Sequence, residues 1–100
     1  MQLPETPSFR LDGKRALVTG AGRGIGLAAA AALAEQGAEV TLVARSADEI
    51  ESAANAIRAR SQGAHALALD VSDLSAVSRE ISAAGPFDIL VNNAGTNRPK

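Results

Sequence analysis

The sequence has 100 residues, of which 46% are hydrophobic, and this composition is typical of one small folded domain rather than a disordered chain. The formal net charge of −1 gives no electrostatic reason to expect nucleic acid or an anionic membrane as a partner. The absence of cysteine excludes disulfides and thiolate metal sites, and one histidine cannot form a metal site alone.

The chain opens with a segment that predicts no secondary structure. Residues 1–8 contain two prolines and are expected to form a flexible tail before a single domain over residues 9–100. The opening segment lacks the apolar core of a signal peptide, and no stretch approaches 18 apolar residues. We therefore expect a cytoplasmic protein.

The first strand and helix are predicted on either side of a glycine-rich turn. The apolar run over 16–18 predicts a strand over about 15–19, and alanine-rich sequence over about 24–36 predicts the helix. Glycine commonly follows a helix, so Gly37 marks its end. Three residues recur at a spacing of four, and we expect them to face the core: Ile25, Ala29 and Leu33.

The second strand is predicted over 39–44, where apolar residues do not alternate with polar ones, as in a parallel strand covered on both faces. Ser46 then opens a helix, and Glu49 three residues later completes a capping-box pattern. The helix is expected to end near Gly63. Its expected buried stripe is Ile50, Ala54 and Ile57.

A third strand, a third helix and a fourth strand complete the pattern. The strands are predicted over 65–70 and 87–91, and Ser72 or Asp73 is expected to cap the helix between them. Gly85-Pro86 is a strong stop signal for that helix. Its apolar repeat is Leu74, Val77 and Ile81.

The predicted order is therefore β-α-β-α-β-α-β. Helices alternating with apolar strands indicate a parallel sheet with right-handed crossovers. We predict an α/β fold, the N-terminal portion of a Rossmann-type doubly wound sheet, with strand order 3-2-1-4.

The turn Thr19–Gly26 reads TGAGRGIG and carries the main functional signal. Its glycines allow a tight turn and close approach of a ligand, and the helix that follows offers unpaired N–H groups to a phosphate. The turn does not fit the common G-x-G-x-x-G fingerprint, because Ile25 stands at the third glycine position counted from Gly20. It is not a P-loop either, since no Gly-Lys-Ser/Thr follows.

The turn does fit the pattern Thr-Gly-x-x-x-Gly-x-Gly, and Asn92-Asn93-Ala94-Gly95 follows the last predicted strand. Together these motifs resemble the short-chain dehydrogenase/reductase family, over about residues 9–100. The opening segment and both motifs are most similar to 3-oxoacyl-carrier-protein reductases. The alternative is that the glycines serve only a tight strand–helix turn.

The resemblance implies a dinucleotide cofactor, and two arginines indicate which one. The carboxylate that binds a free ribose 2′-hydroxyl usually lies about 20 residues after the glycines, where this chain has Ala44. Arg45 follows it, and Arg23 lies in the glycine turn; both suit a 2′-phosphate. We therefore expect NADP(H) in preference to NAD(H), unless both arginines are merely solvated.

The resemblance also places Asp70 at the adenine amino group and Val71 beside the ring, although Asp70 could equally just end its strand. The turn from Asn92 to Gly95 is expected to form a wall beside the adenosine ribose, and Asn92 and Asn93 can also tie their strand to its neighbours. The expected cofactor-binding residues are Gly20, Gly22, Arg23, Gly24, Ile25, Gly26, Arg45, Asp70, Val71, Asn92, Ala94 and Gly95.

The resemblance implies hydride transfer between nicotinamide and a carbonyl or secondary alcohol, using a tyrosine in Tyr-x-x-x-Lys. The sequence contains no tyrosine, so we predict no catalytic residue here and expect the cofactor-binding portion of a longer, homodimeric or homotetrameric reductase. Two alternatives remain open: a non-catalytic nucleotide-binding fragment or sensor, and a Rossmann domain of a different transfer enzyme.

Overall fold

A computed structural model describes residues 10–60, 63–70 and 72–93 of the chain. All seven predicted elements are present in the predicted order. Their bounds are β1 (Arg15–Thr19), α1 (Gly24–Glu35), β2 (Glu39–Ala44), α2 (Ala47–Arg58), β3 (Ala64–Ala68), α3 (Leu74–Ala84) and β4 (Ile89–Asn92).

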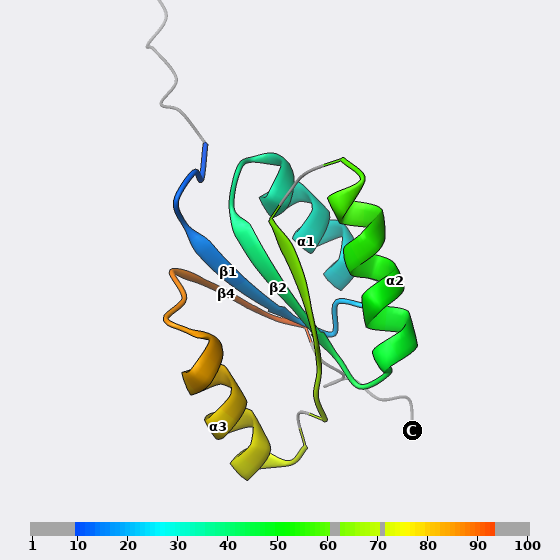
Figure 1. Cartoon of the computed structure of the whole chain (residues 1–100), viewed down its shortest axis with the longest axis vertical. Coiled ribbons are helices and arrows are strands. Elements are labelled where there is room, and N and C mark those ends of the chain that lie inside the picture. The colour runs from blue at the N-terminus through cyan, green and yellow to red at the C-terminus, as the bar shows by residue number, and fades with distance from the viewer. Residues whose placement is uncertain (1–9, 61–62, 71, 94–100) are drawn as a thin grey trace, which may run out of the picture.

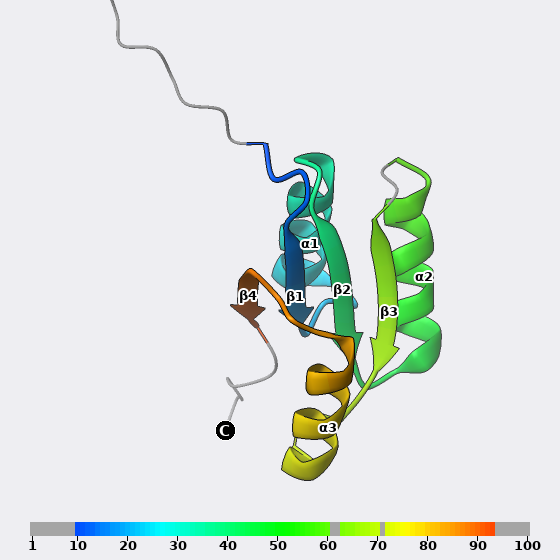
Figure 2. The same ribbon diagram turned by 60° about the vertical axis from the view of Figure 1, so that its left-hand side comes forward.

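The four strands form one parallel sheet in the order β3-β2-β1-β4, which confirms the predicted topology (Figure 2). In the register of the sheet, Thr19 at the end of β1 lies opposite Val43 of β2 and Asn92 of β4. The carboxyl ends of these three strands therefore meet at one edge.

Two helices cover one face of the sheet, and the third lies on the other (Figures 1 and 2). Side chains from α1 and α2 pack with the strands in the larger apolar cluster, which contains the fully buried Val18, Leu42 and Ile50. Ser46 caps α2 by accepting a hydrogen bond from the N–H of Glu49, at 3.2 Å. The predicted α2 stripe of Ile50, Ala54 and Ile57 is buried as expected.

The inward face of α1 differs in part from the prediction: Leu33 packs against the apolar core as expected, although it is only partly buried. Gly26, Ala30 and Ala34 are its buried residues, whereas Ile25 is 78% exposed. The contact of Gly26 with the preceding turn sets the rotation of the helix, so the small residues line the sheet. Ile25 instead lies in the first turn of α1, beside the glycine turn. The apolar spacing suggested a helix but not which of its sides faces the sheet.

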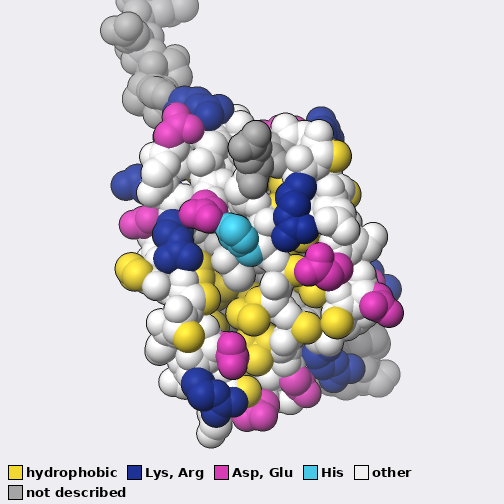
Figure 3. Space-filling model, in the orientation of Figure 1, with side chains coloured by type: hydrophobic (Ala, Val, Ile, Leu, Met, Phe, Trp, Pro, Cys, Tyr) yellow, Lys and Arg dark blue, Asp and Glu magenta, His cyan; other side chains and the backbone are white. Residues whose placement is uncertain are grey.

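The α3 face of the sheet is covered less completely. Val77 and Ile81 pack against Leu17 and Val43, but none of the α3 residues is fully buried, and Leu74 is 76% exposed despite its place in the predicted apolar repeat. Figure 3 shows hydrophobic side chains gathered on the surface toward the part of the molecule that contains α3. Within the described part of the chain, no helix is long and apolar enough to cross a bilayer.

Two strands, β3 and β4, differ from their predicted bounds at both ends. β3 ends at Ala68 rather than at residue 70, although the N–H of Leu69 still donates to the carbonyl of Ala44 at 2.9 Å. β4 begins at Ile89 rather than at residue 87. Asp88 instead lies at the start of β1, where its carboxylate accepts a hydrogen bond from the N–H of Arg15 at 2.9 Å.

Candidate functional site

The glycine turn lies at the edge of the sheet where β1, β2 and β4 end. It links β1 to α1, and Figure 1 shows it as the cyan loop beside the ends of the strands. The N–H of Ala21 donates to the carbonyl of Val43 at 3.1 Å, which ties the turn to β2. The turn is thus held against a neighbouring strand, and the first turn of α1 follows it directly.

Thr19 connects the glycine turn to the segment after β4. Its hydroxyl donates to the Oδ1 of Asn92 at 3.0 Å and accepts a hydrogen bond from the N–H of Asn93 at 2.9 Å. The Nδ2 of Asn93 also donates to the carbonyl of Gly20, at 3.4 Å. These bonds confirm that both asparagines tie their strand to its neighbour. The role of Thr19 follows from the register that sets it opposite Asn92, which the predicted strand order alone does not give.

Three glycines of the turn are required by its conformation. Gly20 and Gly24 have φ values of +62° and +61°, in the left-handed region that side chains disfavour. Gly26 is required for another reason: a Cβ at this position would overlap the carbonyl oxygen of Gly20 and crowd the side chain of Asn93. Beside Gly24, by contrast, a Cβ would meet open space.

The N-terminus of α1 is suited to an anionic group. Arg23 at its N-cap makes no capping side-chain bond, and the first turn contains no acidic residue. Ser46 and Asp73, in contrast, cap α2 and α3 with their side chains. Unpaired N–H groups at a helix start bind phosphate, and the space beside Gly24 leaves room for one. The residues present therefore fit the diphosphate of a dinucleotide.

Arg23 pairs with Glu49, a residue that the sequence predicted only as part of the capping box of the second helix. Its Nε lies 3.5 Å from the Oε2 of Glu49, in the first turn of α2, and the Arg23 side chain is 85% exposed. Arg23 and Glu49 are 26 positions apart in the sequence, and no local sequence signal predicts this pair. It forms because β2 carries the start of α2 to the glycine turn.

Arg45 and Asp70 follow the ends of two neighbouring strands. Asp70 accepts hydrogen bonds at its Oδ1 from the hydroxyl and the N–H of Ser72, at 2.7 and 3.0 Å. These bonds lower the pKa of Asp70, with a smaller contribution from the positive charge of Arg45. The carboxylate is therefore ionised at neutral pH. Both side chains are exposed at the same edge as the glycine turn.

Three of the expected site residues, Val71, Ala94 and Gly95, lie outside the residues that the structure describes. The others, from Gly20 to Gly26 with Arg45, Asp70 and Asn92, lie at the carboxyl edge of the sheet, where the sequence predicted them. Over the described ranges, no group of three or more acidic or histidine side chains could hold a metal ion.

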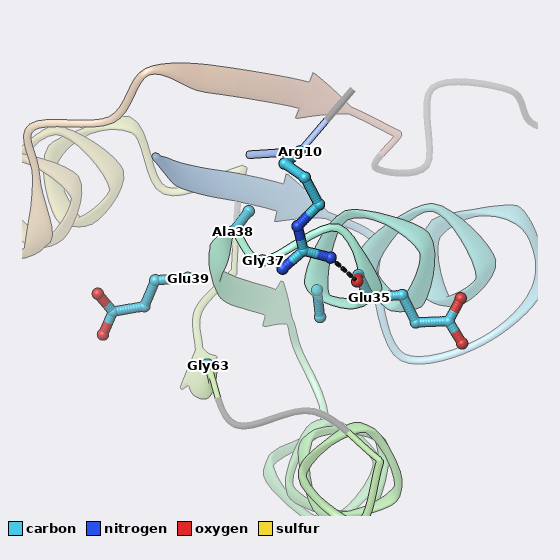
Figure 4. Close-up of a pocket in the computed structure, with 7 residues that line it drawn as sticks. Arg10, Glu35, Gly37, Ala38, Glu39 and Gly63 are labelled. Atoms are coloured by element: carbon cyan, nitrogen blue, oxygen red, sulfur yellow. Dashed lines mark hydrogen bonds between the residues drawn. The ribbon is translucent and has the colours of Figure 1, made fainter. Parts of the chain in front are cut away.

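A separate hollow of about 380 Å³ lies at the opposite edge of the sheet, where β2 begins (Figure 4). Arg10 lies in it and donates to the carbonyl of Glu35 at 3.0 Å, and the same guanidinium pairs with Asp12. Glu39 and Gly63 complete its wall. Because strands run from this edge toward the glycine turn, the hollow is not part of the site described above.

Comparison with known proteins agrees with this geometry. Residues 14–100 match the family model described as short chain dehydrogenase. The chain is 48% identical over 94 residues to gluconate 5-dehydrogenase of Gluconobacter oxydans, covering 90% of this chain and 37% of that protein. It is 47% identical over 88 residues to D-erythrulose reductase of Gallus gallus, and this match covers 88% of this chain and 34% of that protein. The chain thus spans about a third of the length of these curated relatives.

A solved structure shows the same arrangement in a related protein. L-sorbose reductase from Gluconobacter frateurii, complexed with NADPH and L-sorbose, superposes with a TM-score of 0.81 at 37% sequence identity. The match covers 94% of this chain and 38% of that one. The parallel sheet with order β3-β2-β1-β4 is therefore shared with a dinucleotide-binding protein.

Proposed function

Since the chain belongs to the short-chain dehydrogenase/reductase family, we propose that it is the cofactor-binding portion of an NADP(H)-dependent oxidoreductase. The observation that carries the cofactor preference is the composition of the edge beside the glycine turn. Ala44 ends β2 without a carboxylate for a ribose 2′-hydroxyl, while Arg45 and Arg23 lie at that edge. Two cations suit a 2′-phosphate better than a hydroxyl.

In this proposal the glycine turn and the start of α1 hold the diphosphate. The N–H groups of Ile25 and Gly26 belong to the uncapped first turn, and the dipole of α1 favours negative charge there. Gly22 and Gly24 allow the phosphates to approach the backbone. Hydrogen bonds from Thr19 and Asn93 keep the turn in place before the cofactor binds, which lowers the ordering cost of binding.

We assign the adenosine part of the cofactor to the neighbouring strand ends. Asp70 and Val71 follow β3 and would contact the adenine, while Asn92, Ala94 and Gly95 would line the ribose. Two bonds from Ser72 engage Oδ1 of Asp70, so Oδ2 would be the oxygen that faces an adenine amino group.

The bound nicotinamide would supply hydride transfer to or from a carbonyl or secondary alcohol. The sequence contains no tyrosine, so the tyrosine acid/base of the family is not among these residues. The role of this chain is to bind and orient the cofactor. We further propose a small carbonyl or alcohol substrate and a homo-oligomeric assembly, a dimer or tetramer.

The cofactor assignment is tested by Arg45→Asp in the protein, with dissociation constants measured for NADPH and NADH. We expect NADPH to bind roughly ten- to hundredfold more weakly, because charge-assisted bonds to the 2′-phosphate are lost, while NADH changes little. The matched control is Arg79→Asp, which makes the same charge change on the exposed surface of α3. An unchanged ratio of the two affinities in Arg45→Asp would contradict the proposal.

A titration with S-adenosylmethionine separates this function from that of a Rossmann domain with another transfer chemistry. We expect NADPH to bind and S-adenosylmethionine not to compete with it. Binding of S-adenosylmethionine in place of NADPH would favour the alternative.

A further inference from the structure

The carboxylate of Glu49 occupies space at the glycine turn. Its Oε2 lies 3.5 Å from the Nε of Arg23, and a Cβ built on Gly22 would be only 2.8 Å from its Oε1. Glu49 belongs to α2, so this carboxylate reaches the turn from a different element. An acidic group thus lies beside the backbone that we assign to the cofactor phosphates.

This orientation differs from the one that the sequence pattern favours. In a capping box, the glutamate reaches back to the N–H of the serine that caps the helix. Here the hydroxyl of Ser46 does accept a hydrogen bond from the N–H of Glu49. The carboxylate of Glu49, however, pairs with Arg23 rather than with the N–H of Ser46. The Glu49 side chain is 38% exposed, and the guanidinium of Arg23 is largely in solvent. Because little packing holds Arg23, it can exchange one anionic partner for another.

We propose that Glu49 is a specificity-determining residue, an internal anion that competes with the 2′-phosphate of NADP(H) for Arg23. This inference rests on the proposed function. A 2′-phosphate must displace a carboxylate that already neutralises part of the positive charge of Arg23. NAD(H) carries no phosphate at this position and meets no such competition. Glu49 therefore narrows the preference for NADP(H) over NAD(H) that Arg23 and Arg45 create.

The test is Glu49→Gln in the protein, which removes the charge and keeps the shape of the side chain. Binding is measured by calorimetry with NADPH, NADH and adenosine 2′,5′-bisphosphate, a probe that carries the 2′-phosphate without nicotinamide. We expect NADPH and the bisphosphate to bind roughly two- to fivefold more tightly, the size of an exposed ion pair. The affinity for NADH should change by less than the affinities for NADPH and the bisphosphate.

The matched control is Asp48→Asn, which removes the same charge from the neighbouring position in the first turn of α2. It should leave all three affinities nearly unchanged, because the proposed effect requires direct pairing with Arg23. An equal tightening in Asp48→Asn would overturn the proposal and show a general effect of charge. The proposal would also be overturned if Glu49→Gln bound NADPH with unchanged or lower affinity, or if its affinity for NADH rose as much as its affinity for NADPH.

A double-mutant cycle tests whether Glu49 acts through Arg23. In the Arg23→Gln background, Glu49→Gln should no longer tighten binding of the bisphosphate, and a persistent gain would overturn the inference. The cycle also separates this inference from the proposed function. If the wild-type protein binds neither NADPH nor the bisphosphate, the proposed function itself fails; if it binds them but Glu49→Gln has no effect, only the role of Glu49 fails.

Discussion

Gly26, in the first turn of α1, lies against the main-chain carbonyl oxygen of Gly20, the residue that follows β1. A Cβ on Gly26 would overlap that oxygen and lie 2.8 Å from the Nδ2 of Asn93. The contact lets the helix begin close to the sheet, and it directs Ala30 and Ala34 inward while Ile25 stays exposed. One missing side chain thus sets the position of α1 relative to the glycine turn.

We predict that Gly26→Ala destabilises the protein by about 1–3 kcal/mol, because the added methyl group meets rigid backbone. Helix propensity alone predicts the opposite, a gain of up to about 1 kcal/mol for replacing glycine in a helix. The free energy of unfolding from urea denaturation distinguishes the two. As a control, Ala28→Gly on the exposed side of α1 should cost only about 0.5–1 kcal/mol. A stabilised Gly26→Ala protein would contradict the close contact.

The second prediction concerns the hydroxyl of Thr19, whose residue is only 6% exposed. Thr19→Val keeps the shape but leaves the N–H of Asn93 and the Oδ1 of Asn92 without this partner. We expect a loss of about 1–3 kcal/mol in the free energy of unfolding and faster hydrogen exchange at the amide of Asn93. Thr19→Ser retains the hydroxyl and should retain the protection at Asn93. Equal rates of hydrogen exchange at the Asn93 amide in the wild type, Thr19→Val and Thr19→Ser would contradict the hydrogen bond between Asn93 and Thr19.

The third prediction compares two leucines in contrasting environments. Leu42 is fully buried in β2, whereas Leu74 at the start of α3 is 76% exposed. Leu42→Ala should cost about 2–5 kcal/mol, because it removes buried apolar surface and leaves a cavity. Leu74→Ala should change stability by less than about 0.5 kcal/mol. A loss at Leu74 as large as that at Leu42 would contradict its exposure.

The fourth prediction is a pH dependence at Asp70. Hydrogen bonds from Ser72 lower the pKa of this carboxyl in the folded protein. Their contribution to stability is therefore complete above the ordinary carboxyl pKa of about 4, and it is lost as the pH falls through the lower folded value. Ser72→Ala should raise the pKa of Asp70 toward its ordinary value, as measured by NMR titration. Ser78→Ala, on the exposed surface of α3, should leave it unchanged.

Much of this fold could be predicted from local sequence. Strand, glycine turn and helix succeed one another with distinct composition, and stop signals such as Gly37 and Gly85 are read residue by residue. The boundaries of β1 and β2 agree with the prediction, because both strands are short, apolar and flanked by turn residues. The ends of β3 and β4 do not, because pairing with neighbours decides where a strand stops.

The order of the elements, the parallel sheet and the candidate phosphate site after β1 could all be predicted from the sequence alone. These features depend on hydrophobic period and on glycine spacing, which are local. Three other features depend on tertiary packing: α1 turns its small residues toward the sheet, Thr19 accepts a hydrogen bond from Asn93, and Glu49 pairs with Arg23. Each of these contacts depends on how helices and strands pack. Packing brings together residues that are distant in sequence, and a local sequence pattern contains no information about such pairs.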